Sequence, residues 1–454
     1  MKELDLTQGR VPKVLLQFAV PFLIANVLQA LYGGADLFVV GQYDDAASVA
    51  AVAIGSQVMQ TITGIILGIT TGTTVLIAIA TGAKDNRKVA FTIGSSVWLF
   101  SITGVVLTLV MVLFHSRIAE LMHTPVEAMV DTKNYILVCS LGILFIVGYN
   151  VVCGILRGLG DSKTPLYFVG LACVINIVLD FILVGYFHWG ATGAAIATVT
   201  AQGVSFGIAL WFLYRHGFHF DFSRKDIRLN RNLSKKILVL GAPIALQDAL
   251  INVSFLIITV IVNQMGVIAS ASLGVVEKII VFAMLPPMAI SSAVATMTAQ
   301  NYGAGLIKRM NKCLASGIGI ALVFGVSVCV YSQFLPETLT AFFTKDAAVV
   351  AMAADYLRGY SIDCIVVSFV FCINSYFSGQ GNSLFPMIHS LIATFLFRIP
   401  LSYWFSQIDS SSLFIMGFAP PISTVVSLLI CIWYLRYTQR KLYLRGTMMP
   451  AMSN

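Results

Sequence analysis

Long stretches without a single charged residue recur from one end of the chain to the other. The longest extends from Ala46 to Ala83. A helix needs about 20 consecutive apolar residues to cross a bilayer, so stretches of this length are typical of membrane spans. The composition agrees, because 58% of the residues are hydrophobic and 11% are charged, against roughly a quarter charged in a soluble domain. The sequence therefore excludes a water-soluble globular protein and predicts an all-α polytopic membrane protein that contacts the lipid bilayer.

Twelve transmembrane helices can be placed on these stretches. The first follows Lys2, Arg10 and Lys13, and no small-residue cleavage site comes after it. We therefore expect it to be retained as a helix rather than removed as a signal peptide. The predicted spans are 14–41, 52–80, 89–114, 134–156, 164–187, 191–214, 236–263, 270–299, 313–335, 353–377, 385–406 and 412–436.

Lysine and arginine are distributed very unequally between alternate loops. If the N-terminus lies inside, the cytoplasmic segments carry 22 of these residues and the opposite loops carry 3. Short cytoplasmic loops of membrane proteins are enriched in Lys and Arg. We therefore predict a multi-pass protein of the plasma membrane with both termini in the cytoplasm, and we assign the net charge of +8 to orientation rather than to nucleic-acid binding.

The two halves of the chain resemble each other on either side of the longest basic loop, residues 215–236. Each half holds six spans, an even number, so both halves have the same orientation and form parallel repeats. We expect an N-terminal six-helix lobe at 1–222, a C-terminal lobe at 223–454 and a substrate between them. Three pairs of similar segments share an offset near 221 residues: 13–21 with 235–243, 81–83 with 302–304, and 157–165 with 378–386.

One carboxylate, Asp36, lies deep in the first predicted span, and Gly33 and Gly34 precede it by one turn. An ionisable side chain inside the hydrocarbon costs several kcal/mol, so it is rare unless it has a function. The two glycines lack side-chain bulk and would let a neighbouring backbone, water or ion come close. The alternative is an aspartate that only fixes helix packing through hydrogen bonds.

Further oxygen ligands are expected at the same depth as Asp36. Asn176 and Asp180 are four residues apart and therefore share one face of the fifth span, and Thr198 lies in the sixth. At about 1.5 Å of rise per residue, Asp36, Asp180 and Thr198 lie roughly 7–11 Å below the outer boundary. Two carboxylates, an amide and a hydroxyl suit Na+ or a proton shared between the carboxylates. A hydrogen-bonded network that only joins three helices would show the same spacing.

The second half lacks this constellation but carries its own charges in the predicted spans. Asp363 and Arg398 are expected at similar depth, and a buried pair would make the burial of each charge less costly. Glu277 and Lys278 are adjacent and need separate partners, and Asp248 lies near the midplane of the seventh span. Asp363, Glu277 and Asp248 could equally line a wet cavity.

Motifs for other kinds of chemistry are not found in the sequence. The eight cysteines lie in or beside apolar segments without a CxxC pair. We therefore interpret them as small buried residues rather than as partners in disulfides. The six histidines lack zinc-ligand spacing, and no nucleotide-binding fingerprint is present. We expect no cofactor and no nucleic-acid partner.

Several segments resemble the multidrug and toxic compound extrusion (MATE) transporters across essentially the whole chain. They are GGADLFVVG at 33–41, NIVLD at 176–180 and AQNYGAG at 299–305. Together with Thr198, the second segment is similar to the DNA-damage-inducible-type branch. The resemblance implies that Asp36, Asn176, Asp180 and Thr198 bind the coupling cation in the N-terminal lobe. It also implies export of amphipathic, often cationic, drugs by alternating access. Other branches carry a seventh-span acid near Ile251, which this chain lacks.

The sequence thus predicts a transporter rather than an enzyme. With no ATP-binding motif, the energy must come from an ion gradient, so we expect an antiporter that exchanges Na+ or H+ for a small organic compound and acts as a monomer. The alternative is a flippase for lipid-linked precursors from the same superfamily. That activity would need a strongly basic cavity, and only Lys278 and Arg398 lie in the outer-half interior. A nucleophile with its base, a metal cluster, or the repeated filter of a channel is not visible.

Overall fold

The structure is a computed structural model that describes residues 4–408 and 412–448, and no strand occurs in this part of the chain. Eleven helical stretches are long and apolar enough to cross a membrane, and a bent pair makes a twelfth. The prediction of twelve spans in an all-α polytopic membrane protein is therefore confirmed. The bent pair is Val126–Leu141 with Ile143–Gly158, which meet at an angle of 49°.

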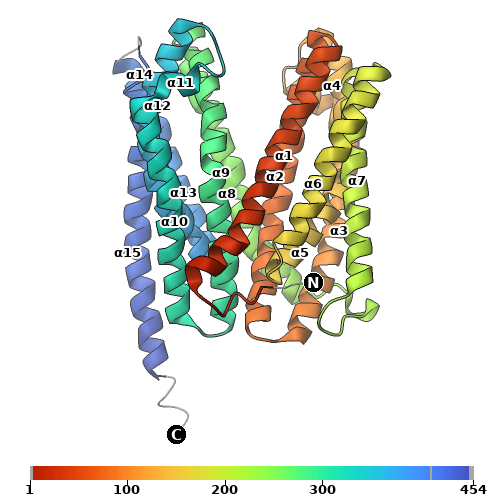
Figure 1. Cartoon of the computed structure of the whole chain (residues 1–454), viewed down its shortest axis with the longest axis vertical. Coiled ribbons are helices and arrows are strands. Elements are labelled where there is room, and N and C mark those ends of the chain that lie inside the picture. The colour runs from red at the N-terminus through yellow and green to blue at the C-terminus, as the bar shows by residue number, and fades with distance from the viewer. Residues whose placement is uncertain (1–3, 409–411, 449–454) are drawn as a thin grey trace. The chain divides into compact units, whose positions relative to one another are not determined.

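Figure 1 labels the helices. In chain order the α-helices are α1 Val11–Tyr43, α2 Ala46–Gly82, α3 Asn86–Leu121, α4 Met129–Leu141, α5 Ile143–Gly158, α6 Lys163–Asp180, α7 Gly190–His216, α8 Arg231–Asn263, α9 Val267–Gly303, α10 Ile307–Phe334, α11 Pro336–Thr340, α12 Ala347–Gly379, α13 Leu384–Ile392, α14 Ile399–Ile408 and α15 Ala419–Met448. Short 3-10 or π segments are η1 Val126–Ala128, η2 Phe181–Tyr186, η3 Arg224–Asp226, η4 Ala393–Arg398 and η5 Met416–Phe418.

Aspartate caps explain where several of these helices begin. The side chain of Asp45 accepts a hydrogen bond from the backbone N–H of Ser48 at the start of α2, and Asp85 accepts one from Lys88 at the start of α3. Asp346 does the same for the first turn of α12. A carboxylate at this position satisfies backbone donors that have no partner inside the helix.

The chain divides into two compact units. Unit 1 comprises Met1–Ala249 and Thr296–Met310, and unit 2 comprises Leu250–Ala295 and Asn311–Asn454. The helices α8, α9 and α10 therefore each contribute residues to both units. These bounds describe packing, and the lobes expected at 1–222 and 223–454 stay a prediction.

In unit 1, α1, α6 and α7 run side by side (Figure 1), and α2 packs against α5. The apolar core of this unit includes Val40, Val52, Ile136 and Ile155. In unit 2, α12 packs against α15, and the core is built around residues such as Leu357.

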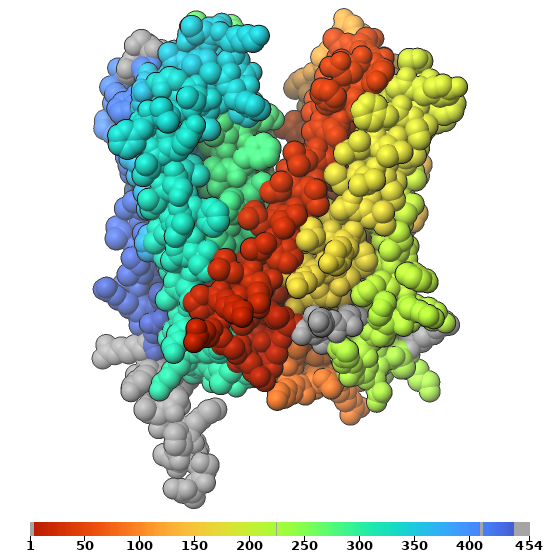
Figure 2. All heavy atoms as spheres, in the orientation of Figure 1, coloured from red at the N-terminus to blue at the C-terminus, as the bar shows by residue number. Residues whose placement is uncertain are grey.

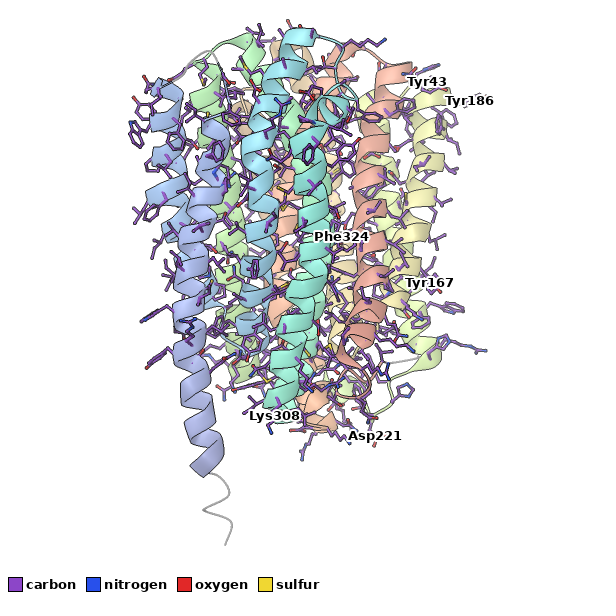
Figure 3. All side chains as sticks on the ribbon, turned by 60° about the vertical axis from the view of Figure 1, so that its left-hand side comes forward. Tyr43, Tyr167, Tyr186, Asp221, Lys308 and Phe324 are labelled. Carbon is purple, nitrogen blue, oxygen red and sulfur yellow. The ribbon has the colours of Figure 1, made fainter. Side chains whose placement is uncertain are left out.

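Many large apolar side chains lie on the outside of the helices. Phe38 of α1 is 62% exposed and Leu113 of α3 is 73% exposed, and the side chains of α1 and α6 are visible at the surface in Figure 2. Tyr167 of α6 points away from the bundle (Figure 3). A helix that is apolar on all sides is typical of a membrane span, because lipid tails contact the outward face.

The basic loop between α7 and α8 is an ordered part of unit 1. Its Phe218, Phe220 and Phe222 pack against the apolar core of this unit, and the indole Nε1 of Trp98 donates a hydrogen bond to the carbonyl of Ile227 at 3.1 Å. The N–H and hydroxyl of Ser223 donate to Asp226, which lowers the pKa of that carboxyl.

Candidate functional site

Asp36 lies inside unit 1, on the part of α1 that faces α6 and α7, and only 4% of its surface is exposed. Its position agrees with a buried carboxylate in the first span. Of the approaches expected at the glycines before it, only that of a neighbouring backbone is ruled out. A Cβ added to Gly33 or Gly34 would meet no atom within 4 Å, so no neighbouring backbone approaches there.

The four residues predicted for the cation site come together from three helices. The hydroxyl of Thr198 on α7 donates a hydrogen bond to Asp36 Oδ2 at 3.0 Å, and the amide of Asn176 on α6 donates to the Thr198 hydroxyl at 3.3 Å. The carboxyl group of Asp180 lies close enough to that of Asp36 for the two to interact electrostatically. Asn176 and Asp180 are both fully buried, as their spacing of one helical turn allows.

Most oxygens of this cluster accept no hydrogen bond from the described residues. They are Asp36 Oδ1, Asn176 Oδ1 and both carboxyl oxygens of Asp180. A buried polar atom without a partner is unusual and calls for an explanation, such as an ion or a proton. These oxygens fit as ligands of a small hard cation, since carboxylate and carbonyl oxygens are the ligands that such ions prefer.

The backbone changes its helix type directly after Asp180. The α-helix α6 ends at this residue and continues as the π-helix η2, Phe181–Tyr186. Single turns of π-helix occur mostly within α-helices and frequently at functional sites. This break in the regular helix therefore supports a functional role for the fifth span at the depth of Asp180.

Two further polar residues extend the cluster, and they were not predicted from the sequence. The amide nitrogen of Gln202 donates to the hydroxyl of Tyr32 at 3.4 Å, and Gln202 Oε1 is buried without a partner. Tyr32 lies one turn before Asp36 on α1, and Gln202 lies one turn after Thr198 on α7. The spacing of four residues was the signal that could have found them.

In unit 2 the expected ion pair between Asp363 and Arg398 is not formed. Asp363 on α12 is 5% exposed, and its Oδ1 has no hydrogen-bond partner among the described residues. The guanidinium of Arg398, at the end of η4, lies instead over the ring of Phe255 at 4.2 Å from its centroid. An aromatic face attracts a cation, so stacking replaces the direct ion pair while Arg398 still attracts Asp363 through space.

The other charged residues predicted in the second half lie on α8 and α9. Glu277 on α9 is half-buried and accepts a hydrogen bond from the hydroxyl of Thr259 at 3.5 Å. Lys278 is exposed, as expected for a neighbour that points in a different direction. Asp248 on α8 is exposed and belongs to unit 1, whereas Glu277 and Lys278 belong to unit 2.

Metal clusters and disulfides were not expected from the sequence. All eight cysteines are free and buried, in line with their interpretation as small apolar residues. Over residues 4–408 and 412–448, no group of three or more His, Cys, Asp or Glu side chains could hold a metal ion. The oxygen-rich cluster around Asp36 is different, since two of its four members are an amide and a hydroxyl.

Together, the spans and the buried polar cluster define a polytopic helical membrane protein with a group of polar side chains buried inside a helix bundle. The family model MatE matches the chain twice, at residues 21–182 and at 243–404. The chain therefore belongs to the MatE family. The second match begins 222 residues after the first, which confirms the prediction of two parallel repeats.

Similar proteins cover almost the whole chain. The probable multidrug resistance protein YpnP of Bacillus subtilis (strain 168) is 29% identical over 89% of this chain and 91% of its own length. The probable multidrug resistance protein NorM of Thermotoga maritima is 27% identical over 86% and 85%. A solved structure described as the outward-facing conformation of a multidrug resistance MATE family transporter has a TM-score of 0.91 at 23% identity, covering 97% of this chain and 99% of that one. This structural similarity supports the fold.

Proposed function

We propose that the protein is an antiporter that exports amphipathic organic compounds, often cationic, in exchange for Na+ or H+. The observation that carries this proposal is the buried cluster of Asp36 and Asp180, in which three of the four carboxyl oxygens accept no hydrogen bond from the described residues. Membership of the MatE family and the multidrug resistance names of the relatives support drug export. They do not favour the flippase alternative, and they support a transporter rather than an enzyme.

Each residue of the cluster has a distinct role in this proposal. The Asp36 and Asp180 carboxylates provide the negative charge for a cation. Thr198 orients Asp36 through its hydroxyl, and Asn176 orients Thr198 while its carbonyl oxygen stays free for the ion. Two adjacent carboxylates repel each other, so binding either Na+ or a proton relieves the same repulsion. Either ion would therefore stabilise the same arrangement and compete for it.

The proposal also covers the membrane in which the protein lies, its orientation there and its branch within the family. We place it in the plasma membrane as a monomer. The unequal distribution of Lys and Arg supports an orientation with both termini in the cytoplasm. We assign it to the DNA-damage-inducible-type branch, because Asp36, Asn176, Asp180 and Thr198 match that pattern and meet in one cluster.

Dye efflux tests the role of the carboxylate directly. Everted vesicles with the wild-type protein should transport ethidium when a sodium gradient or a proton gradient is imposed, and Asp36→Asn should lose this coupled transport. Asn keeps the size and hydrogen bonding of the side chain but cannot change its charge. Asp221→Asn, at an exposed loop position, is the matched control and should transport normally. Normal export against a gradient by Asp36→Asn would show that the carboxylate is structural.

Thermal unfolding separates sodium from protons as the bound ion. A bound ligand stabilises the folded state by about 2.7 kcal/mol at a hundredfold excess over its Kd. The purified protein should therefore melt at a higher temperature in sodium chloride than in choline chloride. The difference should shrink at acid pH and vanish in Asp180→Asn. Identical melting in both salts at neutral and alkaline pH would leave protons as the coupling ion.

A further inference from the structure

The segment before α1, residues 4–9, is irregular in structure yet tightly held, and it has no part in the function proposed so far. Leu6 is fully buried. Its backbone N–H donates to Gln300 Oε1 at 3.3 Å, and its carbonyl accepts a hydrogen bond from the amide of Asn301 at 3.1 Å. Both partners lie at the end of α9, almost 300 residues away in the sequence, and both belong to unit 1.

Arg309, in the part of α10 that belongs to unit 1, completes this arrangement. Its Nη1 donates to the carbonyl of Gly9 at 2.7 Å, its Nη2 donates to the carbonyl of Gln8, and its Nε donates to the carbonyl of Leu6 at 3.4 Å. One guanidinium therefore binds three backbone carbonyls of the segment, those of Leu6, Gln8 and Gly9. A planar group with five N–H donors suits this task, whereas a lysine ammonium would not provide the same fork.

The helix ends beneath the segment touch through glycines that the repeat places in equivalent positions. A Cβ on Gly82 would lie 1.8 Å from the carbonyl oxygen of Gln300, and a Cβ on Gly303 would lie 1.9 Å from that of Ile79. Gln300 also donates to the carbonyl of Gly158 on α5 at 3.1 Å. The ends of α2 and α9 are thus in direct backbone contact, and residues 4–9 are bonded to the α9 side of this contact.

We propose that residues 4–9 form a latch, with Arg309 as its positioning residue, that fastens the end of α9 to unit 1 and is released in each transport cycle. This inference rests on the proposed function, because alternating access requires helices to move between two arrangements. Residues 267–295 of α9 belong to unit 2 and 296–303 to unit 1. Movement of α9 must therefore strain or break the hydrogen bonds that residues 296–303 make to the segment. The bonds from Arg309 to Gly9 and Gln8 are suited to release, because they are exposed and water can replace them.

Accessibility of a cysteine at position 6 tests the latch without requiring transport. Leu6→Cys should react slowly with a hydrophilic maleimide in purified protein, and the buried native cysteines make wild type the background control. Adding Arg309→Ala should accelerate labelling about tenfold or more, and Arg309→Lys should give an intermediate rate. The matched control is Lys308→Ala, since Lys308 is the exposed neighbour of Arg309. Equal labelling with Arg309→Ala and Lys308→Ala would overturn the role of Arg309.

Release during the cycle needs a second measurement. In proteoliposomes that contain ethidium, an imposed sodium or proton gradient should accelerate labelling of Leu6→Cys several-fold. If ethidium moves but labelling stays slow, the segment is a permanent joint and the latch is wrong. If no gradient moves ethidium while Arg309→Ala still speeds labelling, the proposed transport has failed and the positioning role of Arg309 stands. Gly82→Ala should also raise labelling, while Gly274→Ala, which meets no atom within 4 Å, should not.

Discussion

Thr198 has a central position in the unit 1 cluster, because its hydroxyl is the only atom there that both donates to Asp36 and accepts from Asn176 among the described residues. A hydroxyl can hold two helices in register and also orient a carboxylate. Removing it leaves a buried amide and a buried carboxylate with one partner fewer. Loss of a partner for a buried polar group costs about 1–3 kcal/mol, so this residue matters for both stability and ion binding.

We predict that Thr198→Val weakens the stabilisation by sodium, whereas Thr198→Ser keeps it. Valine has nearly the same shape as threonine but neither donates nor accepts, so Asp36 loses its orientation. The measurement is the difference in melting temperature between sodium and choline. Thr71→Val is the control, because among the described residues the Thr71 hydroxyl bonds only to the carbonyl of Leu67 in its own helix. An unchanged sodium effect in Thr198→Val would remove Thr198 from the site.

Arg398 shows how an aromatic ring can take the place of a counter-ion. We predict that a double-mutant cycle with Phe255→Leu and Arg398→Gln gives a coupling of about 0.5–2 kcal/mol, as expected for a partly desolvated cation over an aromatic face. The cycle with Asp363→Asn and Arg398→Gln should give a smaller coupling, because these side chains are not in contact. Both cycles can be measured by thermal unfolding in detergent. A larger coupling for the second pair would restore the ion pair expected from the sequence.

At the scale of elements, the loop between α7 and α8 shows that a connection between two repeats need not be a loose linker. Gly94 of α3 lets the loop approach the helix, since a Cβ there would lie 1.9 Å from the carbonyl oxygen of Asp226. The aromatic side chains of the loop then reach the apolar core of unit 1. Close backbone approach and aromatic anchoring together fix the course of the loop.

We predict that Gly94→Ala destabilises the protein by about 1–3 kcal/mol, the cost of overpacking a tight contact. It should also make the loop more sensitive to trypsin, which cleaves after Lys225 and Arg228. Gly64→Ala on α2 is the control, since its Cβ would meet no atom within 4 Å and alanine is the better helix former. If trypsin cleaves both variants at equal rates, the contact at Gly94 does not hold the loop.

At the scale of the whole molecule, unit 1 has distinct ends. Figure 3 shows Tyr43 and Tyr186 at one end of this unit and Asp221 and Lys308 at the other. The first end also carries an aromatic cluster in which the rings of Tyr186 and Phe187 meet edge to face. Amphipathic aromatic rings are enriched at membrane boundaries, so this end is expected to lie at one surface of the bilayer.

We predict that Lys345→Cys, between α11 and α12, reacts with a membrane-impermeant maleimide in intact cells. Asp221→Cys, in the loop between α7 and α8, should react only in everted vesicles. Both positions are exposed, and the native cysteines are buried, so background labelling should be low. The reverse pattern would place both termini outside the cytoplasm.

Hydropathy, spacing and repetition along the sequence were sufficient for the twelve spans, the parallel repeats and the four residues of the cluster, because these signals are local or recur at a constant offset. The spacing of Asn176 and Asp180 already placed them on one face of a helix. Contacts between distant segments were decided only by tertiary packing, since a one-dimensional pattern does not say which helix faces meet. Packing brought Tyr32 to Gln202 and placed Arg398 over Phe255 instead of beside Asp363. It also bonded Leu6 to Gln300, a contact between segments almost 300 residues apart for which no local signal exists.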